Sequence, residues 1–201
     1  EQLRGFSDRA LRRAYVAAVQ AGAGEQYAFR ADEKIAAANS AQSFDVVLRD
    51  DAARVASASG EPWSMELSWV GVGRDADLEP VAATTRAPRV RDNRVTFTHG
   101  EGAAHWFVNG PLGLEHGFVL DDKPAGGDAP LVLEMKVGGT LTPVLSDSND
   151  AVELQDAAGV TRLHYTDLYA LDANGEELAC SMGVRGSSIE LQVDDAAATY
   201  P

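Results

Sequence analysis

The chain has 201 residues, of which 45% are hydrophobic and 24% charged, a composition typical of a soluble globular protein with its own core. No apolar run approaches the roughly 18 residues that a membrane span requires, so a spanning helix is excluded. The net charge of -14 is concentrated in residues 101–201, where 17 acidic side chains face 4 basic ones. Such a surface repels a phosphate backbone, which argues against nucleic acid as a partner.

The N-terminal segment predicts one short helix, from Ser7 to about Ala21. Ser7 is a favourable N-cap, Phe6 and Leu11 are spaced as a hydrophobic staple, and apolar residues recur at helical spacing until Gly22. An alanine-rich stretch follows up to residue 43. We therefore expect residues 1–43 to form a helix and a connector that belong to one folding unit with the main domain. The alternative is a smaller sandwich with the N-terminal 43 residues packed as an edge extension.

From Phe44 onward the hydrophobic pattern has a period of two, which is typical of half-buried strands. The clearest example is Trp63 to Trp69, where apolar residues alternate with polar ones. Turn signals recur every 8 to 12 residues up to a last strand at Ser188 to Val193, and residues 80–94 are expected to form a long exposed loop. This pattern predicts an all-β fold, an antiparallel β-sandwich over residues 44–201 with a short N-terminal helix.

The glycine-punctuated stretch around Trp106 is the strongest candidate for a ligand site. His105, Trp106 and Asn109 offer an aromatic platform and polar side chains of the kind that bind a carbohydrate or a peptide. The structural alternative assigns Trp106 to one strand face and Asn109 to a turn. Both interpretations remain open at this point.

Two oxygen-rich turns raise the question of calcium. Asp147, Asn149 and Asp150 crowd oxygen ligands into one loop, as does the turn at Asp172 to Glu176. Neither completes the six to eight ligands that calcium prefers, so a solvated turn is the simpler interpretation and calcium the alternative. His99, His105 and His116 lie near acidic residues, but their spacing does not match a zinc motif.

The sequence lacks a recognisable catalytic motif: it has no nucleophile elbow, no phosphate-binding loop and no dinucleotide fingerprint. Four glutamates could form the carboxylate pair of a glycosidase, but any acidic β-protein offers such pairs by chance. They are Glu101, Glu115, Glu134 and Glu153. The single cysteine, Cys180, fits a small buried hydrophobic residue of a strand. We therefore expect a protein that is not an enzyme and has no cofactor, with calcium as the one alternative.

Two arginine clusters stand out in this acidic chain. The first comprises Arg4, Arg9, Arg12 and Arg13, and the second comprises Arg86, Arg89, Arg91 and Arg94. Solvated faces are the simpler interpretation of both clusters, and a binding patch is the alternative.

Several motifs together resemble a known family. They are Ala104 to Phe118, Pro130-Leu-Val-Leu-Glu134, Leu163-His-Tyr165, Leu171-Asp-Ala-Asn-Gly175 and the terminal Tyr200-Pro201. In this series the chain resembles, from about Phe44 to Pro201, the β-rich N-terminal domain of large secreted or surface bacterial proteins that carry FG-GAP (integrin-like propeller) or similar β-repeats.

The resemblance implies a non-catalytic structural or adhesive module of an exported bacterial surface protein, secreted or at the cell surface. It implies adjacent β-repeat domains of the same polypeptide as partners, and a surface glycan or protein as a further partner. The alternative from the residues alone is a carbohydrate-binding or glycan-active domain that uses Trp106 and nearby polar residues.

Overall fold

The computed structural model describes residues 9–49, 52–75, 77–127, 129–148 and 150–201. In this part of the chain one α-helix, α1 (Arg9–Ala21), and one 3-10 helix, η2 (Glu25–Tyr27), precede a succession of antiparallel strands. The strands are β1 (Arg30–Ala31), β2 (Ile35–Asn39), β3 (Phe44–Leu48), β4 (Ala53–Ser57), β5 (Ser64–Arg74), β6 (Asp77–Pro80), β7 (Arg89–Arg91), β8 (Arg94–His99), β9 (Ala103–Gly110), β10 (Gly113–Leu120), β11 (Leu131–Gly139), β12 (Thr142–Leu145), β13 (Val152–Gln155), β14 (Thr161–Tyr165), β15 (Ala170–Leu171), β16 (Glu177–Leu178), β17 (Cys180–Arg185) and β18 (Ser188–Val193).

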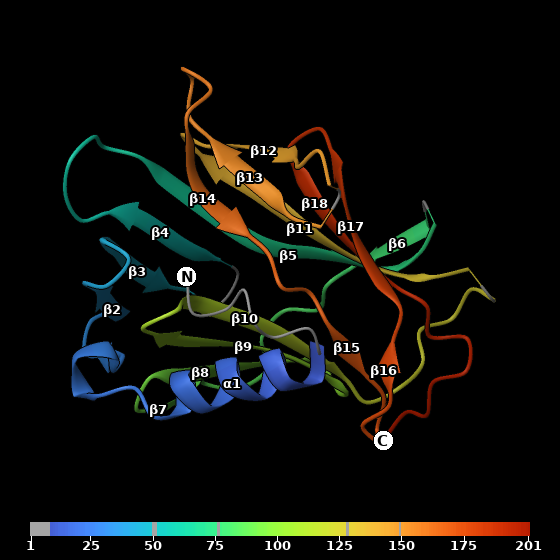
Figure 1. The fold of residues 1–201 in the computed structure, drawn as a ribbon. Helices are drawn as coiled ribbons and strands as arrows, with labels where there is room; N and C mark the ends of the chain where they lie inside the picture. The colour runs from blue at the N-terminus through green and yellow to red at the C-terminus, as the bar shows by residue number, and fades with distance from the viewer. Residues whose placement is uncertain (1–8, 50–51, 76, 128, 149) are drawn as a thin grey trace.

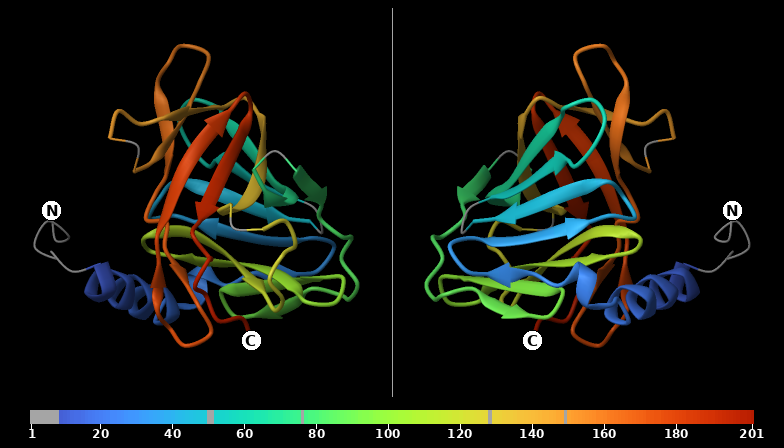
Figure 2. Two further views of the ribbon diagram at one scale, coloured as in Figure 1. Left: turned by 90° about the vertical axis from the view of Figure 1, so that its right-hand side faces the viewer. Right: turned by 90° about the vertical axis from the view of Figure 1, so that its left-hand side faces the viewer.

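Two sheets form the body of the protein (Figure 1). The larger sheet has the order β1-β2-β3-β4-β5-β11-β18-β17, with β6 paired to β5, and the smaller has the order β10-β9-β8-β7. A three-stranded sheet, β12-β13-β14, and a β15-β16 hairpin extend from this body, as both views of Figure 2 show. The predicted all-β, antiparallel, sandwich-like fold with one short helix is confirmed.

The core lies between the inward faces of the two main sheets, and β13 of the three-stranded sheet adds the buried Val152 and Leu154 to it. Alternate residues of β8, among them Val95 and Phe97, are fully buried against apolar residues of β3, β5 and β11. The predicted alternation of Trp63 to Trp69 is confirmed, since Met65, Leu67 and Trp69 are buried. Burial of such side chains, at about 1.5–3 kcal/mol each, is the main stabilising contribution to the sandwich.

The larger sheet begins earlier in the chain than the sequence pattern indicates. The alanine-rich stretch that was expected to be a connector contains β2, which pairs with β3 in register from Ile35↔Leu48 to Asn39↔Phe44. Its small side chains hide the period of two, because alanine contributes little to a hydrophobic pattern. The expected boundary at residue 44 therefore falls within a sheet, between two hydrogen-bonded strands.

The expected long loop at residues 80–94 also contains a strand. β7 pairs with β8 through a tight turn at Asp92 and Asn93, and Asp92 adopts a positive φ of 49°. Asp and Asn tolerate this left-handed conformation, so the turn follows from local chemistry. Strand β7, with the three residues Arg-Val-Arg, is too short and too charged to be recognised as a strand from the sequence.

Helix α1 ends at Ala21 as predicted, but the most deeply buried of its described side chains is polar. Leu11 is 52% exposed, whereas Gln20 is only 2% exposed. The expected cap at Ser7 and the staple residue Phe6 lie outside the described residues. Gln20 Nε2 donates to the carbonyl of Gly113, and Gln20 Oε1 accepts from the backbone N–H of Leu112. Polar contacts to the β9–β10 turn thus fix the end of the helix.

A network of buried asparagines joins the two main sheets. Asn109 of β9 is fully buried, and its Nδ2 donates to the carbonyls of Tyr27 and Ala38, each at 3.0 Å. Its Oδ1 accepts from Asn39 Nδ2 of β2 at 2.8 Å. Asn93 Nδ2, in the β7–β8 turn, donates to the carbonyls of Asn109 and Gln20. The network therefore connects α1, η2, the larger sheet and the smaller sheet.

The C-terminal segment is clamped to the body by a buried ion pair. Arg74, at the end of β5, forms a bidentate ion pair with Asp195, in which its two terminal nitrogens donate to the two carboxylate oxygens at 2.7 and 2.8 Å. The side chains of Arg74 and Asp195 are 3% and 2% exposed. The Tyr200 hydroxyl donates to the same carboxylate at 2.6 Å. These bonds from Arg74 hold the pKa of Asp195 below its usual value, despite the opposing effect of burial.

No described helix is long and apolar enough to cross a membrane.

The integration of the last strand leads to a first prediction. β18 lies between β11 and β17, with Leu191 buried at 2% exposure and Gln192 half-buried on the opposite face. Replacing Leu191→Asp should prevent folding, because it places an unpaired charge in the core. Replacing Gln192→Asp should cost less than about 0.5 kcal/mol. Thermal denaturation followed by circular dichroism measures both effects, and equal losses for the two variants would contradict an integrated strand.

The Arg74–Asp195 pair leads to a second prediction. The variant Asp195→Asn leaves the buried guanidinium without its counter-charge, which should lower the free energy of unfolding by about 3–5 kcal/mol. The matched control is Asp167→Asn, because Asp167 pairs with Arg12 where both side chains are more than 40% exposed. That exposed pair should contribute less than about 1 kcal/mol. Urea denaturation of both variants tests this difference, and a small loss for Asp195→Asn would rule out the clamp.

Candidate functional site

The candidate site lies on the outward face of the smaller sheet, which we call the outer face. Antiparallel pairing aligns its side chains in two rows across four strands. One row is Arg89, Thr96, Trp106 and Gly117, and the other is Arg91, Arg94, Val108 and Glu115. Arginines occupy the β7 and β8 end of the rows, and the only carboxylate of the two rows occupies the β10 end. Charge therefore changes sign across the outer face.

Trp106 is half-buried at the centre of this face, and it is covered on two sides. Its six-membered ring lies directly on the backbone of Gly117, where an added Cβ would be 2.2 Å from Cζ2 of the indole. The guanidinium carbon of Arg94 lies 4.1 Å from the ring centroid. This is a cation–π arrangement, which is favourable at the half-exposed surface of a protein. Trp106 thus supports an arginine instead of presenting an open aromatic face.

The arginine end of the outer face forms a shallow pocket of about 150 Å³. Arg89, Arg91, Arg94 and Thr96 line it, and the three arginines are exposed. Within the described part of the chain, neither Arg89 nor Arg91 forms an ion pair. Arg89 and Arg91 thus present guanidinium groups that no described carboxylate neutralises.

Glu115 and Tyr169 are the electrostatic neighbours of Arg94. Partial burial raises the pKa of Glu115, and the nearby positive charge of Arg94 opposes that rise. Partial burial likewise lowers the pKa of Arg94, opposed by Glu115 and Tyr169. A guanidinium stays protonated under physiological conditions, so Arg94 remains a cation. The indole of Trp106 lies beneath the guanidinium of Arg94, and Arg94 also lines the pocket.

The two other predicted ligand residues lie on the opposite face. His105 and Asn109 point inward, where they are 5% and 0% exposed, because neighbouring residues of a strand alternate between faces. His105 and Trp106 are adjacent in sequence, yet the sheet separates them. The structure therefore does not bring the three predicted residues together on one surface, and only Trp106 lies at the candidate site.

His105 belongs to a buried cluster of histidines and aromatic rings. Its Nδ1 lies 2.6 Å from Nε2 of His99, whose Nδ1 lies 2.8 Å from the carbonyl of Ala82. The His105 ring stacks on Phe97 at 4.8 Å between centroids and meets Trp69 edge-on. Burial, followed by the neighbouring His99, lowers the pKa of His105 to about 3. The imidazoles here act as core residues.

His116 of β10 lies in the same cluster, stacked on Phe107 with 4.3 Å between ring centroids. Both of its ring nitrogens are buried, and neither makes a hydrogen bond with the described residues. Burial holds the pKa of His116 well below its usual value, and His105 lowers it further. Among the described residues, no group of three or more His, Cys, Asp or Glu side chains is arranged to hold a metal ion.

The predicted calcium loop is only partly described, because Asn149 lies outside the described residues. Asp150 Oδ1 accepts hydrogen bonds from the hydroxyls of Ser146 and Ser148. These bonds, chiefly the one from Ser148, lower the pKa of Asp150. Asp147 is exposed beside them. Calcium at this loop remains a proposal.

The four glutamates considered as a carboxylate pair are distributed over different elements. Glu115 lies on the outer face, Glu134 on the larger sheet opposite Glu190, and Glu153 on the three-stranded sheet. Glu101 lies in the turn between β8 and β9. Glu153 accepts hydrogen bonds from Gln155 and Thr161, which lower its pKa, the opposite of what a general acid needs.

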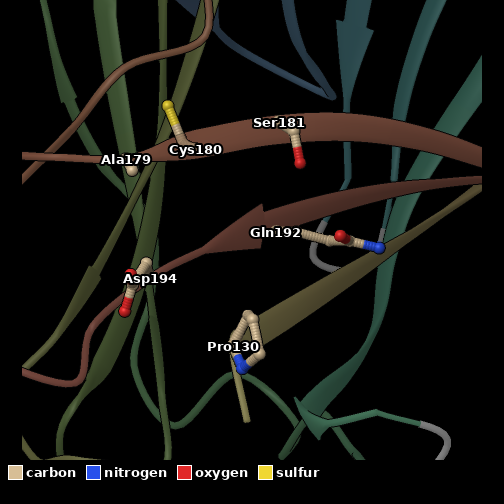
Figure 3. Close-up of a pocket in the computed structure, with 6 residues that line it drawn as sticks. All are labelled: Pro130, Ala179, Cys180, Ser181, Gln192 and Asp194. Carbon is tan, nitrogen blue, oxygen red and sulfur yellow. The ribbon is translucent and has the colours of Figure 1, made fainter.

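A second concavity, of about 250 Å³, opens at the edge of the larger sheet (Figure 3). Its lining residues are Pro130, Ala179, Cys180, Ser181, Gln192 and Asp194. Figure 3 shows Cys180 and Ser181 pointing to opposite sides of β17, as alternation in a strand requires. The thiol lies 3.6 Å from the carbonyl of Leu168. No basic residue lines this concavity, so its chemistry does not favour a reactive thiolate.

The arginines of the site stand out in the sequence, but their arrangement does not. Arg89, Arg91 and Arg94 belong to the second basic cluster, and the tight turn after Arg91 places them on one face. Thr96 and Gly117 carried no sequence signal, because their roles come from cross-strand pairing with Arg89 and Trp106. An alternating Arg-x-Arg followed by a two-residue turn and a further Arg was the available indication.

Comparisons with protein-family models, with curated proteins and with solved structures each find no match. The resemblance to the β-rich domain of FG-GAP-bearing bacterial proteins therefore stays a prediction.

The buried histidines lead to a third prediction. Since the pKa values of His105 and His116 are lowered on folding, the unfolded chain binds more protons than the folded one below pH about 6.5. Stability should therefore be fully present above that pH and fall as pH decreases toward about 3. The variant His116→Phe removes two unpaired nitrogens without changing the stack on Phe107. It should raise the melting temperature at pH 5 more than at pH 7.5.

The matched control is His164→Phe, because His164 is exposed on β14. This control should leave the pH dependence of the melting temperature unchanged. Equal pH dependence of the wild type and His116→Phe would contradict an unprotonated, buried His116.

Proposed function

We propose that the chain is a non-catalytic structural or adhesive module of an exported bacterial surface protein, with a surface glycan as its ligand. The carrying observation is the stack of Gly117, Trp106 and Arg94, which presents a cation on the surface of a rigid sheet. Nothing at this face resembles a nucleophile with its base, whereas the exposed arginines suit binding.

The C-terminal clamp supports the structural part of the proposal. Asp195 is bound to Arg74 of the larger sheet, and the Tyr200 hydroxyl donates to Asp195, so the segment up to Tyr200 has a fixed position relative to the outer face. A domain that follows, such as the β-repeats that the resemblance implies, would then hold the outer face in a defined orientation. Fixed orientation is what an adhesive or spacer module requires.

A second candidate function is binding of neutral sugars on the Trp106 ring. It is favoured by the half-exposure of Trp106, since sugar rings stack on aromatic faces. The position of Arg94 over the ring opposes it. Removing that arginine separates the two, because Arg94→Gln would uncover the platform and strengthen binding of neutral sugars if the ring were the contact.

A fourth prediction tests the proposal with the variant Gly117→Ala. The new methyl group would displace the Trp106 ring and with it Arg94, so we expect retention on a glycan array to fall at least about fivefold. The matched control is Gly183→Ala on β17, where an added Cβ meets only ordinary contacts of 3.8 Å or more. That variant should bind as the wild type does.

The same array tests the absence of catalysis. We expect the wild type to be retained by glycans and to release no sugar product from any of them. Release of a product would overturn the non-catalytic part of the proposal, and failure to bind any glycan would overturn the adhesive part.

A further inference from the structure

We propose that the pocket lined by Arg89, Arg91, Arg94 and Thr96 binds the sulfate or carboxylate groups of an anionic polysaccharide. This inference rests on the proposed function and adds the chemical class of the ligand. The pocket contributes three cationic side chains and one hydroxyl donor from two neighbouring strands. Guanidinium groups form paired hydrogen bonds with planar or tetrahedral oxyanions, which makes arginine the preferred residue for such groups.

The backbone that carries the arginines, and the side chain of Arg94, are held in place before any ligand arrives. The β7–β8 turn is fixed from two sides, because Phe29 N donates to the carbonyl of Asp92 and Asn109 N donates to that of Asn93. Asn93 Nδ2 anchors the same turn to Gln20. The cation–π stack on Trp106 restricts Arg94 further. A preorganised site loses less conformational entropy on binding, so these contacts favour affinity.

The surrounding charge favours a polymer with widely spaced anionic groups. The protein carries a net charge of -14, so the basic patch is a local exception on an acidic surface. At physiological ionic strength charges interact over only about 8 Å. A ligand anion that lies beyond the patch is therefore repelled by the acidic side chains nearest to it and is no longer attracted by the arginines. Nucleic acid carries one negative charge per about 1.7 Å of duplex. A polysaccharide with one or two charges per sugar places fewer anions over the acidic surroundings.

The pocket volume agrees with this class. A pocket of about 150 Å³ accommodates a single sulfate or carboxylate with part of its sugar ring. Glu115 at the far end of the outer face would repel a second anion there, while its carboxylate would accept a hydrogen bond from a sugar hydroxyl. The charge gradient across the outer face therefore gives the ligand an orientation.

The experiment compares two double variants of equal net charge. Arg89→Gln/Arg91→Gln removes two pocket cations that are exposed and make no ion pair within the described residues, so folding should be unaffected. The control Arg30→Gln/Arg54→Gln removes two exposed arginines from the larger sheet. Binding is measured by calorimetry at low and physiological salt. The probes are a sulfated glycosaminoglycan hexasaccharide, an oligogalacturonate, a neutral dextran oligomer and a double-stranded DNA oligonucleotide.

The expected result is binding of the sulfated or the carboxylated probe by the wild type and the control, and a Kd at least about tenfold higher for the pocket variant, equivalent to about 1.4 kcal/mol. Which of the two probes binds more tightly identifies the oxyanion. Equal affinities of the two double variants, tighter binding of the oligonucleotide, or binding of dextran alone would each overturn the inference. Binding of dextran alone would still leave the proposed glycan adhesion intact, so the two failures are distinguishable.

Discussion

The side-chain amide of Asn109 is the interaction on which the arrangement of the two sheets depends. It is fully buried, and its two donors and its acceptor are satisfied by η2, the end of β2 and Asn39. A buried amide without partners costs several kcal/mol, so η2, the end of β2 and β9 must meet at one place for the fold to be stable. Apolar burial drives the sheets together but does not by itself specify which edge of one sheet meets the other. The polar network supplies that specificity.

The candidate site depends on the same network. Asn93 belongs to it, and Asn93 is also half of the turn that presents the arginines of β7 and β8. The buried interior and the exposed outer face are therefore joined through one hairpin. The two faces of β9 have different roles. His105 and Phe107 pack in the core, while Trp106 supports Arg94 on the outer face. Strand alternation makes this division possible within three consecutive residues.

Charge has opposite roles in two regions of the molecule. Arg74 is enclosed with Asp195 and holds the C-terminal segment against the body, so its charge is matched internally. Arg89 and Arg91 have no such partner in the described chain and face solvent. A cation that the protein does not neutralise attracts a ligand anion, whereas a neutralised one contributes to structure. This contrast is the physical basis for assigning a structural role to the first and a binding role to the second.

The sequence by itself determined the fold class, the main strands and the turns, because a period of two and Gly, Asn and Asp turn residues are local signals. It did not reveal β2, whose alanines carry little hydrophobic contrast, or β7, which is three residues long. For the site, the sequence supplied Trp106 and the arginine cluster as separate features. Only tertiary structure placed Trp106 between Gly117 and Arg94 and removed His105 and Asn109 to the core. Cross-strand register and the choice of face are set by pairing between distant segments, which no local pattern encodes.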